Sequence, residues 1–145
     1  MHRIRIQTWY EKYKTGLFRY ALTLVKKPET AEDVLQEVFL RLLSGRSSPE
    51  PGQEQAYLYR MARNLCFDHL RRQKRLDQEP PQIPWEQSQY TYIELIALLD
   101  PREQEIVTLK IVGGLTHREI AKVLGLTEHA AKKRYERAIQ KLREE

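Results

Sequence analysis

Residues 115–142, LTHREIAKVLGLTEHAAKKRYERAIQKL, contain two helix-start signals with a glycine between them. Thr116 and Glu119 make a capping-box pair, which predicts a helix that starts beside Thr116. Gly125 can take the left-handed backbone conformation that ends a helix, and Thr127 can then cap a second helix. A small alanine, Ala121, lies four residues before that glycine, which suits two helices that cross closely. This combination predicts a helix-turn-helix.

The second of these helices has an apolar face and a polar face. Its apolar residues recur at the spacing of a buried helical stripe, at Ala131, Tyr135, Ala138, Ile139 and Leu142. The opposite face carries His129, Lys133, Glu136, Arg137 and Gln140. A helix of this kind can enter the major groove of DNA, with its first turns against bases and its later cations against phosphates. A helical hairpin with a solvated basic face is the alternative interpretation.

The composition of the chain sets broad limits on its class. It has 145 residues and a formal net charge of +5, which suits a polyanionic partner without identifying one. No apolar run approaches the ~20 residues that cross a bilayer, and the first residues lack a signal-peptide core. Cys66 is the single cysteine, which excludes an internal disulfide. We therefore expect a cytoplasmic protein without membrane insertion.

Residues that could carry chemistry are sparse. Cys66 and His69 lie one helical turn apart, but both fall toward the apolar side of their helix and no second pair lies nearby. We interpret them as a packed thiol and a satisfied histidine rather than as a metal site. His117 and His129 flank the helix-turn-helix and are interpreted as DNA or surface contacts. The sequence shows no nucleophile–base arrangement, P-loop or paired catalytic carboxylates, so neither an enzyme nor a cofactor is expected.

Helix signals run along the whole chain, while strand signals are almost absent. Further periodic apolar runs cover residues 8–25, 30–43, 55–73, 92–99 and 101–112. Residues 44–53 are rich in serine, proline and glycine and predict a loop, and the proline-rich residues 76–89 predict an extended linker. The sequence thus predicts an all-α protein with two small helical domains, residues 1–75 and 90–145, joined by that linker.

The helix expected over residues 30–43 presents a mixed outer surface. Thr30 would cap it, with Asp33 as the capping partner. Its core stripe consists of Ala31, Val34, Leu35, Val38, Phe39 and Leu42. The opposite face carries Asp33, Gln36, Glu37 and Leu40, which we call the docking strip. An exposed leucine among acids and an amide is typical of a surface that binds another protein's helix, although single exposed apolar residues are also ordinary.

The helix expected over residues 55–73 has a cationic outer face. Its inward residues are Leu58, Met61, Ala62, Leu65 and Cys66. Arg60, Arg63, Asn64, Phe67 and Arg71 line the outward face, and Lys74 and Arg75 extend the charge. Cations that alternate with an aromatic ring and an amide favour nucleic acid, and an ordinary solvated face is the alternative. Asp68 and Arg72 are expected to pair four residues apart along the helix.

Two blocks of the sequence resemble a known family. AEDVLQEVFLRLL followed by YLYRMARNLCFDHLRRQKR resembles region 2 of bacterial RNA polymerase sigma factors of the extracytoplasmic-function (ECF) group. LIALLDPREQEIVTLKIVGGLTHREIAKVLGLTEHAAKKRYERAIQKLRE is similar to their region 4. The resemblance covers nearly the whole chain except the linker, and the two blocks stand in the family's order. It implies a region 2 helical bundle, a region 4 helix-turn-helix, and a dissociable polymerase subunit that selects promoters.

The resemblance also assigns expected roles to individual positions. Asp33, Gln36 and Glu37 match the stretch that docks on the clamp helices of the largest core polymerase subunit. Asn64, Asp68 and Arg71 match the helix that handles the −10 element and strand opening. Lys132, Lys133, Arg134 and Arg137 match the helix that lies in the −35 major groove, and Thr116 and His117 start the helix before it. Three positions depart from the family's usual residues: Tyr57, Ala131 and Ile139.

These matches define the expected function. The chain would bind core RNA polymerase and promoter DNA, with its two DNA-reading domains held apart by the linker, and an anti-sigma factor is a further partner that the resemblance allows. The alternatives are a stand-alone helix-turn-helix activator and a sigma-like regulator that occupies polymerase without productive initiation.

Overall fold

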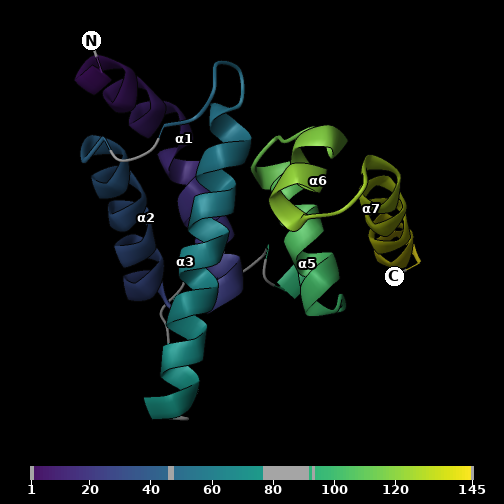
Figure 1. The fold of residues 1–145 in the computed structure, drawn as a ribbon. Helices are drawn as coiled ribbons and strands as arrows, with labels where there is room; N and C mark the ends of the chain where they lie inside the picture. The colour runs from purple at the N-terminus through teal and green to yellow at the C-terminus, as the bar shows by residue number, and fades with distance from the viewer. Residues whose placement is uncertain (1, 46–47, 77–91, 93, 145) are drawn as a thin grey trace.

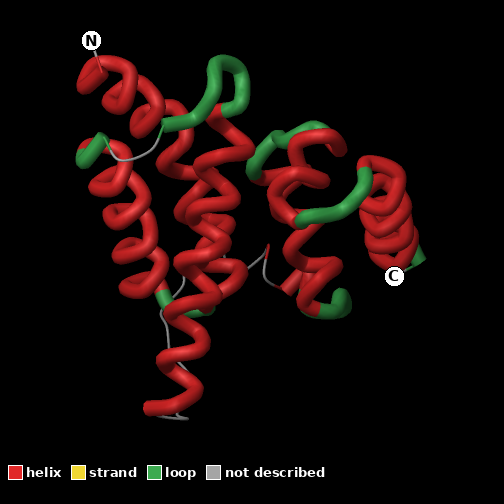
Figure 2. Tube along the Cα trace, in the orientation of Figure 1, coloured by secondary structure: helices red, strands yellow, loops and turns green. Residues whose placement is uncertain are grey.

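The computed structural model describes residues 2–45, 48–76, 92 and 94–144. Its helices are α1 (His2–Val25), α2 (Pro28–Leu43), α3 (Glu54–Leu76), α5 (Pro101–Val107), α6 (His117–Leu124) and α7 (Glu128–Arg143), with the π-helical turn η1 (Thr108–Val112) after α5. Within the described ranges every regular element is helical and none is a strand (Figure 2). The expected all-α class is confirmed. Beyond Leu76, the predicted linker lies outside the described residues.

Helices α1, α2 and α3 form one packed unit in which α1 contacts both of the others (Figure 1). The stripe expected on α2 is buried as a set: Ala31, Val34, Leu35, Val38, Phe39 and Leu42. The start of α2 differs from the prediction, because the helix begins at Pro28 and Thr30 lies inside it. Lys26 takes a left-handed conformation (φ 66°) that ends α1, and the fixed φ of proline then suits the first position of α2. A backbone turn therefore replaces the expected side-chain cap.

Helices α5, α6 and α7 form a second unit, in which α7 contacts both α5 and α6. Asp100 caps α5 through a capping box with Glu103. The single helix expected over residues 101–112 is divided into α5 and the wider turn η1. Small buried residues allow the helices of the helix-turn-helix to approach closely, since Ala131 and Ala138 are fully buried in α7 and Ala121 is buried in α6.

The two helical units are in contact rather than held apart. Helices α1 and α3 of the first unit pack against α5, η1 and α6 of the second, and the units stand side by side in Figure 1. The aromatic ring of Tyr59 on α3 lies where the units meet and is 1% exposed. Its hydroxyl lies close to Gly16 of α1 and to Gly113, the residue after η1.

Because Gly16 has no side chain, the Tyr59 hydroxyl can lie against its backbone. A Cβ atom at position 16 would overlap that oxygen, at a distance closer than real Cβ contacts allow. Elsewhere in a helix, alanine is favoured over glycine by about 0.5–1 kcal/mol. Overpacking a rigid core costs about 1–3 kcal/mol, so packing outweighs helix propensity at this position.

We therefore expect Gly16→Ala to lower the free energy of unfolding by about 1 kcal/mol, measured by urea denaturation. Thr15→Ala, at the neighbouring exposed position of α1, is the control and should leave stability unchanged or raise it slightly. The double variant Gly16→Ala/Tyr59→Phe lacks the clashing hydroxyl and should recover the loss. A stabilising effect of Gly16→Ala alone would contradict the packing described here.

Candidate nucleic-acid interface

The helix-turn-helix is built by the local signals that the sequence predicted. The Thr116 side chain accepts a hydrogen bond from the backbone N–H of Glu119 (3.1 Å), and the Glu119 carboxylate accepts one from the backbone N–H of Thr116 (2.9 Å). Gly125 ends α6 in the left-handed conformation, with φ 69°. The Thr127 hydroxyl accepts from the N–H of Ala130 at 3.1 Å and caps α7. These predicted caps are confirmed, and they fix the angle at which α7 leaves α6.

Helix α7 presents most of the residues predicted to read DNA. His129, Lys132, Lys133 and Arg137 are exposed, while Arg134 is half-buried. We call these five residues the recognition face. Glu136 and Gln140 are also exposed. The face is predominantly cationic, as phosphate binding requires.

A groove of about 520 Å³ lies between the start of α5 and the recognition face. Its walls are formed by Asp100, Arg102, Glu103, His129, Ala130, Lys133, Arg134 and Arg137. Arg102 is exposed and brings an additional cation to α7 from another helix. Sequence reasoning missed Arg102, because its proximity to α7 depends on how α5 packs.

The two residues that begin α6 lie in different environments. Thr116 is exposed, whereas His117 is half-buried with its ring 5.6 Å from that of Tyr135. Its Nδ1 atom is buried and has no hydrogen-bond partner among the described residues. Burial lowers the pKa of His117, and the ammonium groups of Lys110 and Lys132 lower it further. Both effects favour the neutral imidazole, so His117 is a weaker source of positive charge for a phosphate than an unperturbed histidine.

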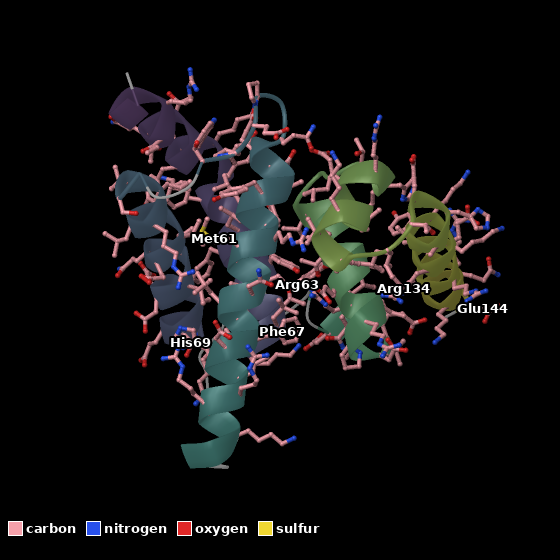
Figure 3. All side chains as sticks on the ribbon, in the orientation of Figure 1. Met61, Arg63, Phe67, His69, Arg134 and Glu144 are labelled. Carbon is pink, nitrogen blue, oxygen red and sulfur yellow. The ribbon has the colours of Figure 1, made fainter. Side chains whose placement is uncertain are left out.

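The cationic face of α3 is divided. Arg60, Asn64 and Arg71 are exposed, whereas Arg63 and Phe67 are half-buried. Figure 3 shows Arg63 on the side of α3 that faces the second unit, with Phe67 one turn further along. The Arg63 guanidinium lies 4.7 Å from the centre of the Phe67 ring, a cation–π distance. Its Nε donates to the Glu105 carboxylate at 2.7 Å, so the expectation that Arg63 points freely outward is wrong for this arrangement.

Two smaller expectations on α3 have different outcomes. Asp68 pairs with Arg71, three residues away, instead of with Arg72, so the predicted pairing is wrong. Both spacings place side chains on the same helical face, and sequence spacing alone could not choose between them. Cys66 is fully buried, which agrees with a packed thiol, and burial raises its pKa to about 12. His69 is half-buried.

The docking strip on α2 is accessible. Asp33, Gln36 and Leu40 are exposed, and Glu37 is half-buried with its carboxylate 3.4 Å from Nε of Arg41. Beside the strip, an apolar groove of about 530 Å³ runs between α1 and α2. We call it the docking groove; its walls are formed by Ile6, Gln7, Tyr10, Gln36, Phe39, Leu40 and Leu43.

The docking groove exposes large apolar side chains. Leu40 is 59% exposed, Leu43 is 51% exposed and Tyr10 is 38% exposed. The Tyr10 ring meets Phe39 edge to face, with centroids 5.1 Å apart, and this contact joins the walls of the groove. Sequence reasoning missed Tyr10 and Leu43. Leu43 was visible as a further apolar residue at the end of its helix, but nothing in the sequence placed Tyr10 beside it.

Two other kinds of site are absent from the described residues. No group of three or more His, Cys, Asp or Glu side chains there could hold a metal ion. None of the helices in the same part of the chain has the length and apolar character needed to cross a bilayer.

Comparison with known proteins identifies the family. The model for Sigma-70 region 2 matches residues 9–76, and the model for Sigma-70, region 4 matches residues 91–142. The ECF RNA polymerase sigma factor BldN of Streptomyces coelicolor is 33% identical, and the match covers 92% of this chain and 57% of BldN. The RNA polymerase sigma factor CarQ of Myxococcus xanthus is 30% identical, and the match covers 83% of this chain and 77% of CarQ.

A solved structure shows the same fold. It is the sigma factor RpoE in complex with the anti-sigma factor NepR from Bartonella quintana, with a TM-score of 0.71 and 21% identity over 95% of this chain and 96% of that chain. The fold and its surfaces thus define the class of the protein: a helical protein of two units, one of which carries a helix-turn-helix. The chain belongs to the ECF group of the sigma-70 family of RNA polymerase sigma factors.

The half-buried ring of His117 gives a prediction that does not depend on DNA. Because its folded-state pKa is lowered, we expect it to titrate below pH 6.5, the value of an unperturbed histidine. Below pH 6.5 the unfolded chain then binds this proton more readily than the folded one, so this residue's contribution to stability falls as the pH falls. NMR titration of the ring resonances measures the midpoint, with His117→Gln used for assignment. A titration midpoint at or above pH 6.5 would contradict the conclusion that burial lowers the pKa of His117.

Proposed function

We propose that this chain acts as a sigma factor that binds core RNA polymerase and directs it to promoters, where it reads the −10 and −35 elements. The observation that carries this proposal is the distribution of its surfaces. The recognition face lies on one helical unit, while the docking strip and the cationic face of α3 lie on the other. A chain that carries both DNA-reading and protein-docking surfaces suits a subunit that places an enzyme on DNA.

The recognition face supports a role at the −35 element. Its first residues follow the Thr127 cap, so they would stand at the major-groove end of α7. Lys133 and Arg137 lie one turn apart, and both are exposed. Arg102 would add a contact from the start of α5.

The docking strip and docking groove support the contact with polymerase. Leucines that are more than half exposed beside acidic groups suit an amphipathic helix with apolar and basic residues. The cationic face of α3 lies on a different helix, so one unit could hold polymerase and approach the −10 strand together. We propose that the chain acts in the cytoplasm, without catalytic residues or a cofactor of its own. RpoE was solved with an anti-sigma factor, and we propose that this chain has a partner of the same class.

Run-off transcription with purified core polymerase on genomic DNA, with start sites mapped, tests the proposal. The chain should add start sites that core polymerase alone does not use, and these sites should share two sequence elements. Start sites identical to those of core polymerase alone would reject the proposal. Tight, sequence-specific protection of DNA by the free chain, unchanged by core polymerase, would favour a stand-alone activator instead.

Removal of cations from the recognition face should reduce promoter use. We expect Lys133→Ala and Arg137→Ala each to lower transcription from a −35-dependent promoter about tenfold, since a lost base contact costs about 1–3 kcal/mol. Both side chains are exposed, so the fold should survive. Arg143→Ala, which removes an exposed cation from the last turn of the same helix, is the matched control and should change transcription less than twofold. Normal transcription by both test variants would contradict the proposed position of α7 in the major groove.

Truncation of the docking groove should weaken core polymerase binding. We expect Leu40→Ala/Leu43→Ala to raise the dissociation constant for core polymerase about tenfold or more, because exposed apolar anchors commonly carry much of an interface's binding energy. The control is Leu98→Ala, which shortens a leucine that is 60% exposed but lies outside the groove. Fluorescence anisotropy of labelled protein measures the affinity. Equal losses in the test variant and the control would show that the groove has no special role.

A further inference from the structure

A pocket that promoter reading does not use lies where the two helical units meet. Its volume is about 370 Å³, which falls within the ~300–1,000 Å³ typical of small-molecule sites. Both units contribute to its walls. These include Lys12, Gly16 and Arg19 of α1, Tyr59 of α3 and Gly113 after η1. We call this cavity the seam pocket.

The charged side chains that line the seam pocket are both cations. Lys12 and Arg19 are exposed, and the residues that line the pocket include no Asp or Glu. The two cations lie seven residues apart on α1, which is about two helical turns, so they share one face with Gly16 between them. Neither forms an ion pair with another described residue. Their charges are therefore available to an anion that enters the pocket.

An aromatic ring holds one of these cations in place. The Lys12 ammonium lies 5.4 Å from the centre of the Tyr13 ring, a cation–π distance. Tyr13 is buried and also lines the seam pocket. This contact restricts the lysine side chain, and a restricted side chain loses less conformational entropy when it binds a ligand.

The Tyr59 hydroxyl adds a neutral donor. Tyr59 is 1% exposed and lines the seam pocket, and its hydroxyl makes no hydrogen bond with another described residue. Burial chiefly, and then the nearby Tyr13, raises the pKa of Tyr59 above its usual value, so the hydroxyl keeps its proton. It can therefore donate to a ligand oxygen without breaking an existing hydrogen bond within the protein.

We propose that the seam pocket binds a small organic anion that carries a phosphate monoester. Its three terminal oxygens match the three available donors, which are Lys12, Arg19 and the Tyr59 hydroxyl. A carboxylate, with two oxygens, would leave one of these donors without a partner. The organic part of the ligand would fill the rest of the cavity, toward Val112 and Gly113. This inference goes beyond the proposed function, since promoter reading needs no small ligand.

Isothermal titration calorimetry of the chain with three compounds tests the ligand class. Adenosine monophosphate should bind saturably, with one molecule per chain. Inorganic phosphate should bind more weakly, because it lacks an organic part, and adenosine should not bind, because it lacks the phosphate. Absence of saturable binding by both phosphate compounds would overturn the proposal, and so would equal binding of adenosine and adenosine monophosphate.

Removal of the pocket cations tests the location. We expect Lys12→Gln/Arg19→Gln to weaken adenosine monophosphate binding at least tenfold, because charge-assisted hydrogen bonds to the phosphate are lost. Both side chains are exposed, so the fold should survive. Arg5→Gln/Lys14→Gln is the matched control, since it removes two cations of the same helix that do not line the pocket, and it should change the affinity less than twofold. Equal losses in the two double variants would indicate general attraction to a basic chain and overturn the proposal.

Tyr59→Phe tests the neutral donor, because it removes the hydroxyl and keeps the ring. It should weaken adenosine monophosphate binding several-fold while circular dichroism stays unchanged. An unchanged affinity would overturn the role assigned to Tyr59. If Tyr59→Phe does not fold, Lys12→Gln/Arg19→Gln and its control decide the proposal by themselves.

A nucleic-acid backbone shares the phosphate chemistry but carries phosphodiesters, so competition distinguishes the two sources. A single-stranded 20-nucleotide DNA without terminal phosphates is titrated into the chain saturated with adenosine monophosphate at fixed salt. The phosphorus NMR signal of the bound nucleotide should persist, because a polymer does not fit into a cavity of this size. Displacement by the DNA that is lost in Lys12→Gln/Arg19→Gln would assign the seam pocket to nucleic acid and overturn the small-ligand proposal.

Discussion

The arrangement of the molecule depends on the burial of one carboxylate. Glu105 is removed from water in the contact between the two helical units, and an ionised carboxylate tolerates this only when strong donors surround it. Tyr20 and Arg63 supply those donors from two different helices, so the position of α5 relative to the first unit is set by both at once. Close packing of Tyr59 beside Gly16 and Gly113 fits the same orientation. This polar contact adds a defined geometry to the buried apolar cluster that both units share.

Most of the surfaces proposed to bind partners lie away from this contact. The docking groove and the recognition face are both accessible, and they sit on different units. Arg63 is the exception, because its guanidinium pairs with Glu105 of the second unit while lying over the Phe67 ring of its own helix.

The sequence by itself determined the features whose partners lie within about four residues. The capping box of Thr116, the left-handed Gly125 and the buried stripe of α2 were all predicted correctly, because helix caps and helical faces are set by local spacing. The local errors have local causes. Pro28 started α2 before the expected cap at Thr30, and Arg71 rather than Arg72 met its acidic partner, since two spacings were equally possible.

Only the tertiary structure decided which distant side chains share a surface. Arg63 and Glu105 are 42 residues apart, and each belongs to a regular helical pattern that gives no sign of the other. The placement of Tyr10 beside Leu43, and of Arg102 beside α7, depends in the same way on how complete helices pack. Helical periodicity tells which face of a helix is polar, but a polar face can meet water, DNA or another domain. That choice depends on the summed packing of all the helices, which no single segment contains.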